Sequence, residues 1–192
     1  LRGAKEFGYP FLLKNDHTAG GVGIEVVSSK MAAIRALYRL KWKFVRARLA
    51  AVFRGQISFR RLFLETVLPT ITLQEFVRGR PATSAFACWK GEVVGAVHVD
   101  VVQEVYPRGP ATVVRLTTNS AMDDVAKKIA SRLCLAGIHG LDYVRDSATG
   151  TEVLIEMNPR LTQIAHFNLG DDRDPAHGLV SAISPTHAVA RP

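Results

Sequence analysis

The sequence predicts an α+β protein in which antiparallel hairpins are separated by helices. Two apolar, β-rich runs flank a glycine-rich loop in residues 9–27, and two more flank a cluster of turn residues in residues 140–160. Between them, residues 34–52 carry apolar side chains at spacings of three and four, which is the period of a helix. At 192 residues the chain can bury a core as one domain or as two small lobes.

The first hairpin brings a lysine to the edge of a glycine loop. Tyr9–Lys14 is an apolar run that ends in lysine, and the β-branched Ile24–Val27 is the expected returning strand. The loop Asn15–Gly23 joins two strands, so it is neither a Walker loop nor a dinucleotide fingerprint, both of which open a helix. Its backbone N–H groups could form an anion nest beside the lysine charge, although an ordinary glycine hairpin is the alternative.

The next segment concentrates the positive charge of the chain. Ser28 or Ser29 is a good N-cap, and we expect the helix to end near Gly55. Its periodic apolar residues are Ile34, Tyr38, Trp42, Val45, Leu49 and Val52, with the basic residues predicted on the opposite face. No acidic residue interrupts the basic ones, which are Lys30, Arg35, Arg39, Lys41, Lys43, Arg46, Arg48, Arg54, Arg60 and Arg61.

Three interpretations of this basic face compete. It could be a solvated helix face, which is the usual outcome and the one we favour, a surface for membranes or acidic partners, or a nucleic-acid patch. No aromatic-interleaved platform or recognition-helix module accompanies it, so we rank nucleic acid low.

The middle and the end of the chain alternate between strands and helices. Lys90-Gly91 predicts a tight turn, Asn119 or Ser120 predicts a helix start, and residues 102–118 are expected to be irregular or β. The expected strands are Ile71–Val77, Ala82–Trp89 and Glu92–Val102, and the expected helical segments are Phe59–Val67, a helix ending near Gly137, a loop or short helix in Leu161–Gly170, and Pro175–Ser184.

The hairpin at Gly140–Arg160 is the most informative stretch. Leu141–Arg145 and Glu152–Asn158 are the expected strands, separated by turn residues. We expect the hairpin to close with Asp146 opposite Glu152.

That register places two acids face to face. Asp142 falls opposite Glu156, and Asn158 points to the same face because side chains two apart on a strand share a face. Facing carboxylates repel, whereas a carboxylate pair with an amide oxygen suits Mg²⁺ that holds substrate phosphates. The alternative is a solvated edge hairpin whose acids are paired by Arg145 or Arg160.

Composition excludes several classes of protein. No apolar run approaches the roughly 18 residues needed to cross a bilayer, and no signal peptide is visible, so a soluble, cytoplasmic protein is expected. Cys88 and Cys134 lack metal-ligand spacing and are expected to be core residues in a reducing compartment. The six histidines are scattered, which argues against a zinc site.

The order of these parts resembles the ATP-grasp superfamily over roughly residues 1–170. The matching parts are the strand ending in Lys14, the glycine loop, a strand, a helix, LQEFVRGRPAT, a K-G turn, a helix, GLDYV and LIEMNPR. The closing IEMNPR is similar to the carboxylase and carbamoyl-phosphate synthase branches. The resemblance implies two α+β lobes, residues 1–73 and 74–192, whose antiparallel sheets sandwich the nucleotide, and an N-terminal domain that is absent from this chain.

The resemblance also implies a role for each matched residue. Lys14 would contact the nucleotide phosphates, and Arg160 would stabilise the reacting phosphate or carboxylate, which makes these two the expected catalytic residues. The mobile loop would contain Gly20, Gly21 and Gly23, the adenine-binding hinge Gln74, Glu75, Phe76 and Val77, and the metal-ligand set Asp142, Glu156 and Asn158.

Members of this superfamily are mostly ADP-forming ligases that join a carboxylate to an amine or thiol through an acyl phosphate. The resemblance therefore implies ATP, Mg²⁺ or Mn²⁺, a small carboxylate substrate and an amine or thiol acceptor. One departure is Arg78-Gly79-Arg80-Pro81, which stands where the family usually carries a glutamate for the ribose. The alternative is a catalytically silent module whose basic helix binds an acidic partner, RNA or anionic lipid.

Overall fold

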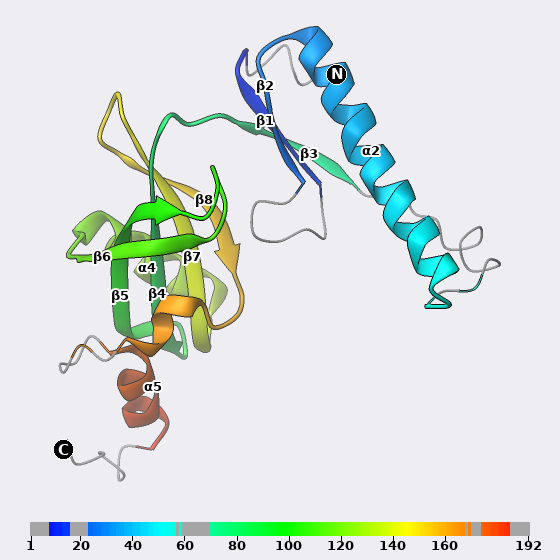
Figure 1. Cartoon of the computed structure of the whole chain (residues 1–192). Coiled ribbons are helices and arrows are strands. Elements are labelled where there is room, and N and C mark those ends of the chain that lie inside the picture. Colours follow the sequence, from blue (N-terminus) through cyan, green and yellow to red (C-terminus); the bar gives the residue numbers. More distant parts are fainter. Residues whose placement is uncertain are drawn as a thin grey trace. The chain divides into compact units, whose positions relative to one another are not determined.

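The chain forms two compact units, shown in Figure 1. The computed structural model describes residues 8–15, 23–56, 58, 70–167, 169 and 174–184. One unit comprises residues 1–76 with 106–110, and the other comprises residues 77–105 with 111–192. The helical piece expected at Phe59–Val67 lies outside the described residues. The predicted α+β class with antiparallel sheets is confirmed.

The first unit is a three-stranded antiparallel sheet with one long helix packed against it. The sheet has the order β2-β1-β3, with β1 at Phe11–Asn15, β2 at Ile24–Val27 and β3 at Ile71–Glu75. Helix α2 covers Lys30–Phe53. As expected, Ser29 caps it, because its side chain accepts the Ala32 N–H at 3.2 Å.

The buried face of α2 differs from the sequence expectation. Ala33, Ala36 and Leu40 are buried and pack on β1 and β2 with Phe11 and Val27. Of the expected apolar stripe, Tyr38, Trp42 and Leu49 are exposed, and Ile34, Val45 and Val52 are only half-buried. Periodicity alone does not distinguish two apolar stripes on one helix, and the small alanines allow the closer approach to the sheet.

The second unit is a five-stranded antiparallel sheet of order β6-β5-β4-β7-β8. Its strands are β4 (Gly79–Trp89), β5 (Glu92–Glu104), β6 (Ala111–Thr117), β7 (Gly137–Asp146) and β8 (Glu152–Asn158). One face packs against α4 (Ser120–Leu133) through Phe86, Leu141 and Tyr143. The other face packs against the 3-10 helix η1 (Gln163–His166) and against α5 (Pro175–Ile183).

Strand β4 begins three residues earlier than expected. Gly79 already pairs with Asp146 of β7, and Pro81 pairs with Val144. Proline cannot donate to a ladder, but β4 meets β5 only from Ala82 onward, so Pro81 lies where one side of the strand has no partner strand.

Two turn residues and one cysteine adopt left-handed backbone conformations. Lys90 and Gly91 have φ of 51° and 84°, which suits the predicted tight turn. Cys134 has φ of 49° at the C-cap of α4 and is exposed, so the prediction that it is a core residue is wrong. Cys88 is buried as expected. In the described part of the chain, no helix is both long and apolar enough to cross a membrane.

Candidate functional site

The β7–β8 hairpin brings Asp142 opposite Glu156 by a route that the sequence did not predict. The hairpin closes with Arg145 opposite Glu152, one residue away from the expected pair. Tyr143 then pairs with Leu154, and a bulge follows before Asp142 pairs with Glu156. Since a bulge adds one residue to one strand, it restores the expected pairing of the two acids.

The bulge also decides which face the acids occupy. Leu141 and Tyr143 belong to the core under α4, and Met157 packs against that core. Side chains alternate along a strand, so Asp142 and Glu156 point to the other face. Without the bulge, Glu156 would share the α4 face with Glu152.

The third expected ligand lies beside the pair. Asn158 donates its Nδ2 hydrogen to Asp142 Oδ2 at 2.9 Å, which leaves the amide oxygen as an acceptor. Asp142 and Asn158 are half-buried, and Glu156 is exposed. Within the described residues, no three His, Cys, Asp or Glu side chains gather into a metal-binding group. If the acids hold a cation, the Asn158 amide oxygen is the neighbouring group that could complete the set, and two carboxylates with an amide oxygen fit a hard cation such as Mg²⁺.

Arg145, one of the two arginines expected to pair with the acids, has other partners. Arg145 points to the α4 face, where its Nε donates to Glu152 at 2.6 Å and its Nη2 to Asp100 at 2.9 Å. These hydrogen bonds, the one to Glu152 above all, raise the pKa of Arg145. Arg160 is exposed after the end of β8, and its Nη1 lies 3.4 Å from the Leu161 carbonyl oxygen. Of the alternatives that the sequence left open, pairing of the acids by Arg145 is therefore wrong.

The Arg145 cluster is a feature that the sequence analysis missed. Glu152 is nearly fully buried and also accepts a hydrogen bond from Asn119, the N-cap residue of α4, at 2.8 Å. The cluster therefore links β5, β7, β8 and the start of α4. The only sign of this cluster in the sequence was that Arg145 and Glu152 stand at opposite ends of the hairpin turn.

The segment that carries Arg160 is positioned by a glycine. A side chain at Gly140, which pairs with Asn158, would collide with the side chain of Thr162. Glycine at this position lets Thr162 lie directly on the sheet, so the chain turns back over the face that carries the acids.

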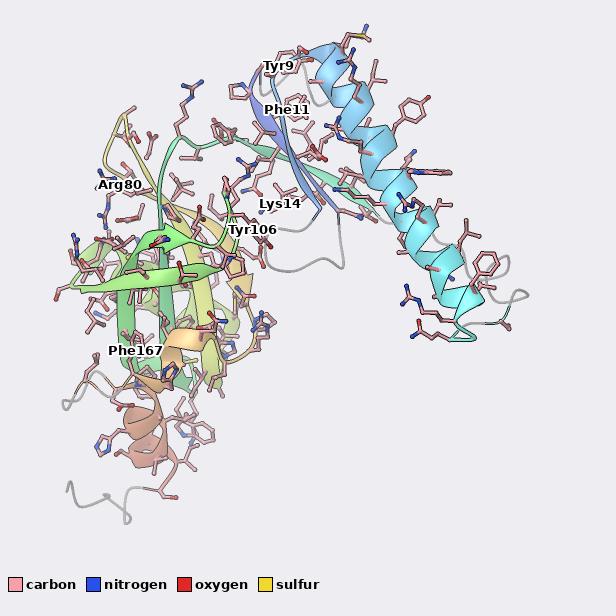
Figure 2. All side chains as sticks on the ribbon, in the orientation of Figure 1. Tyr9, Phe11, Lys14, Arg80, Tyr106 and Phe167 are labelled. Atoms are coloured by element: carbon pink, nitrogen blue, oxygen red, sulfur yellow. The ribbon has the colours of Figure 1, made fainter. Side chains whose placement is uncertain are left out.

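Of the residues expected to contact nucleotide, those that the structure describes lie in the first unit, apart from Val77, which is the first residue of the second unit. Lys14 is half-buried on β1, between Ile24 of β2 and Thr72 of β3, and is labelled in Figure 2. Gly23 has φ of 82°, and its carbonyl accepts the Asn15 N–H at 3.0 Å, which closes the hairpin. Gly20 and Gly21 lie outside the described residues.

The expected adenine-binding segment straddles the end of a strand. Gln74 and Glu75 are the last residues of β3, and Phe76 and Val77 follow without regular structure. The boundary between the two compact units falls between Phe76 and Val77.

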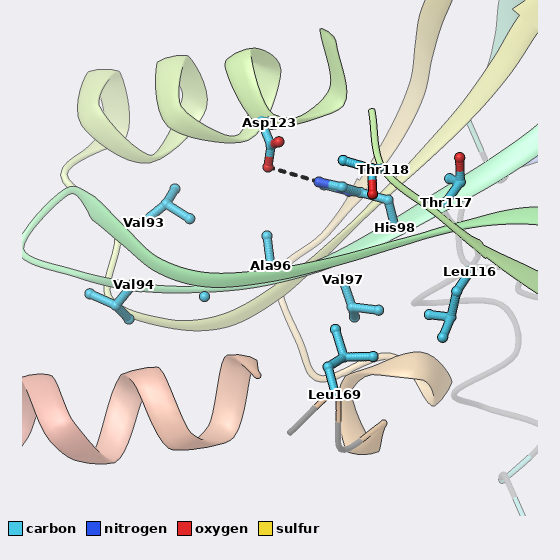
Figure 3. A pocket seen from close by; sticks show the side chains of 11 residues that line it. Val93, Val94, Ala96, Val97, His98, Leu116, Thr117, Thr118, Asp123 and Leu169 are labelled. Atoms are coloured by element: carbon cyan, nitrogen blue, oxygen red, sulfur yellow. Dashed lines mark hydrogen bonds and ion pairs between the residues drawn. The ribbon is translucent and has the colours of Figure 1, made fainter. Parts of the chain in front are cut away.

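A cavity of about 410 Å³ lies beside the part of β5 that β6 does not cover. Figure 3 shows His98 and Asp123 joined above β5 in this cavity. His98 Nε2 lies 2.9 Å from Asp123 Oδ1, and its Nδ1 lies 2.7 Å from Ser84 Oγ. This is a serine–histidine–aspartate chain, but Ser84 is fully buried and cannot reach a substrate. We therefore assign the chain to bracing α4 against the sheet.

Tyr143 supplies a pH-dependent test of the second unit. Burial is the main cause that raises the pKa of Tyr143 to about 12, from 10. Between those values the unfolded chain has lost the phenol proton and the folded chain keeps it, so stability falls as the pH rises through this window. We expect a loss of about 2 kcal/mol between pH 10 and 12 from this group. Urea unfolding at several pH values should show a shallower decline in Tyr143→Phe than in the wild type, whereas the exposed Tyr38→Phe should match the wild type.

Residues 4–163 match the ATP-grasp domain family, and the chain belongs to that family. No curated protein matches the chain significantly in sequence.

Solved structures support the same fold. Biotin carboxylase of Campylobacter jejuni in an ATP complex has a TM-score of 0.60 and 17% identity, over 98% of this chain and 39% of that one. The biotin carboxylase domain of Hydrogenobacter thermophilus 2-oxoglutarate carboxylase, with MgADP and bicarbonate, has a TM-score of 0.59 and 19% identity, over 84% and 33%. Carboxyaminoimidazole ribonucleotide synthase of Aspergillus clavatus with ATP has a TM-score of 0.58 and 15% identity, over 94% and 43%. The chain thus spans less than half the length of each of these proteins.

Proposed function

We propose that this chain is the nucleotide- and magnesium-binding part of an ADP-forming ligase. The reaction would join a carboxylate to an amine or thiol nucleophile through an acyl phosphate. The observation that carries the proposal is the facing pair Asp142 and Glu156, with Asn158 hydrogen-bonded to Asp142, in a member of the ATP-grasp family.

The proposed chemistry needs positioning and charge stabilisation more than covalent catalysis by the protein. Bound Mg²⁺ would neutralise charge on the phosphate oxygens. Asp142, Glu156 and Asn158 would hold the ion, with the Asn158 hydrogen bond fixing the Asp142 carboxylate. Lys14 would provide a point charge for phosphate, and the exposed Arg160 guanidinium would stabilise the reacting phosphate or carboxylate.

The first test is nucleotide-linked stability. A ligand that binds only the folded chain raises its stability by roughly 2.7 kcal/mol at a hundred times its dissociation constant. We expect Mg-ATP to raise the free energy of unfolding of the chain, and ATP with excess EDTA to have a much smaller effect. Lys14→Met should reduce the Mg-ATP effect, whereas Lys127→Met, on the exposed side of α4, should not. Equal stabilisation with and without magnesium would reject the metal site.

The second test addresses the reaction. The longest form of the protein that contains this chain would be supplied with ATP, Mg²⁺ and a library of carboxylates, with hydroxylamine present to trap an acyl phosphate as a hydroxamate. We expect ADP and hydroxamate to appear together for at least one carboxylate. Release of AMP and pyrophosphate would reject the ADP-forming assignment while leaving nucleotide binding intact.

A further inference from the structure

Helix α2 exposes an apolar stripe on the side directly away from the sheet. Met31, Tyr38, Trp42 and Phe53 are 59%, 73%, 61% and 89% exposed, and Leu49 is also exposed. Their spacings of seven, four, seven and four residues keep them on one face, because the helix repeats every 3.6 residues. Side chains stand away from the sheet along α2 in Figure 2.

The stripe lies opposite the face that packs on the sheet. Tyr38 follows the buried Ala36 by two residues, and Trp42 follows the buried Leu40 by two. Two residues correspond to about 200° around the helix axis. The sheet therefore cannot cover the stripe.

Basic residues border the stripe on both sides. One border consists of Lys30, Lys41 and Arg48, and the other consists of Arg35, Arg39 and Arg46, since spacings of four, seven and eleven residues return to nearly the same side of a helix. No acidic residue occurs in α2. Arg39 is paired with Glu25 at 2.9 Å, and the carboxylate raises its pKa. The helix therefore combines an exposed apolar stripe with a strong, one-signed charge.

We propose that α2 lies on an anionic lipid surface, with the stripe inserted at the headgroup level and the basic borders facing the lipid phosphates. Interfacial helices have an apolar face bordered by lysine and arginine, whose alkyl stems bury while the charges stay in water. Tyrosine and tryptophan favour the headgroup region because each ring combines an apolar body with a polar tip. This surface is separate from the proposed nucleotide-binding residues.

The charge pattern favours lipid over the two other anionic partners. A single-stranded nucleic acid is held in a basic groove with aromatic platforms, whereas α2 is a convex helix. An acidic helix would contact only one basic border at a time, whereas a membrane contacts both borders at once. Binding to nucleic acid and binding to an acidic protein are the alternative outcomes of the experiment.

The experiment measures binding of the whole chain to vesicles. Trp89→Phe leaves Trp42 as the single tryptophan, whose emission shifts to the blue on entry into the headgroup region. We expect a blue shift and co-sedimentation with vesicles of 70% phosphatidylcholine and 30% phosphatidylserine, both reversed by high salt. Vesicles of phosphatidylcholine alone should bind much more weakly.

Two variants of α2, with a matched control on α4, separate the stripe from its borders. Lys41→Gln with Arg46→Gln should weaken binding about 25-fold, at about fivefold for each charge near an anionic surface. Lys127→Gln with Lys128→Gln removes the same charge from α4 and should change binding little. Tyr38→Ser, exposed in the folded chain, should weaken binding and leave circular dichroism unchanged.

Three results would overturn the proposal. They are equal binding to neutral and anionic vesicles, an equal effect of the α2 and α4 charge variants, and binding to RNA or polyglutamate without binding to vesicles. None of them bears on the Mg-ATP response, so this proposal can fail while the proposed ligase function stands.

Discussion

Glu156→Gln is expected to make the chain slightly more stable without magnesium and to abolish the additional stability from Mg-ATP. Asp142 and Glu156 face each other directly on neighbouring strands. Like charges in this position are destabilising, so a neutral amide should add about 0.5 kcal/mol to the free energy of unfolding. The same change removes a metal ligand, so the roughly 2.7 kcal/mol expected from saturating Mg-ATP should disappear.

Urea unfolding with and without Mg-ATP measures both effects in one experiment. Asp142→Asn should behave in the same way, and the double variant should be no worse than either single one, since all of them remove the same ion. Glu92→Gln, exposed at the start of β5, is the matched control and should keep the full Mg-ATP effect. A Glu156→Gln chain that keeps the magnesium response would contradict the proposed metal site.

The sequence was most informative where local rules agree with the fold. In the β7–β8 hairpin, turn residues at 146–151 separate two strand-like runs, and the pairing of Asp142 with Glu156 is confirmed. The predicted closing pair, Asp146 with Glu152, was wrong. The prediction used a symmetric turn, and the alternation of apolar and polar residues does not show where a bulge occurs. The N-caps at Ser29 and Asn119 are confirmed, because capping depends only on a side chain and the next three residues.

What the sequence could not predict depends on contacts between distant segments. Arg145 was a candidate partner for the acids, but its partners Asp100 and Glu152 are set by the order of the strands in the sheet. Similarly, α2 carries two apolar stripes. The stripe with alanines packs against the sheet because its small side chains allow a close approach, whereas hydrophobicity alone favours the aromatic stripe.

Phe86→Ala is expected to lower the free energy of unfolding of the second unit by about 4 kcal/mol. Phe86 is fully buried on β4 and lies in the core under α4 with Met122 and Leu141. Its ring centroid also lies 5.6 Å from that of His139. Truncation to alanine removes the ring from a densely packed core and leaves a cavity that the alanines of α4 are too short to fill.

The change should leave the acidic pair intact, because Phe86 points to the α4 face and Asp142 to the other. Urea unfolding followed by Trp89, in a Trp42→Phe background, reports the second unit, and Val113→Ala on the exposed side of β6 is expected to cost less than 0.5 kcal/mol. While Phe86→Ala remains folded, Mg-ATP should add the same increment of stability as in the wild type, whereas Glu156→Gln loses it. A Phe86→Ala chain that unfolds at the wild-type urea concentration would contradict this core. A Phe86→Ala chain that is folded but not stabilised by Mg-ATP would mean that packing under α4 and the geometry of the acids are coupled through the sheet.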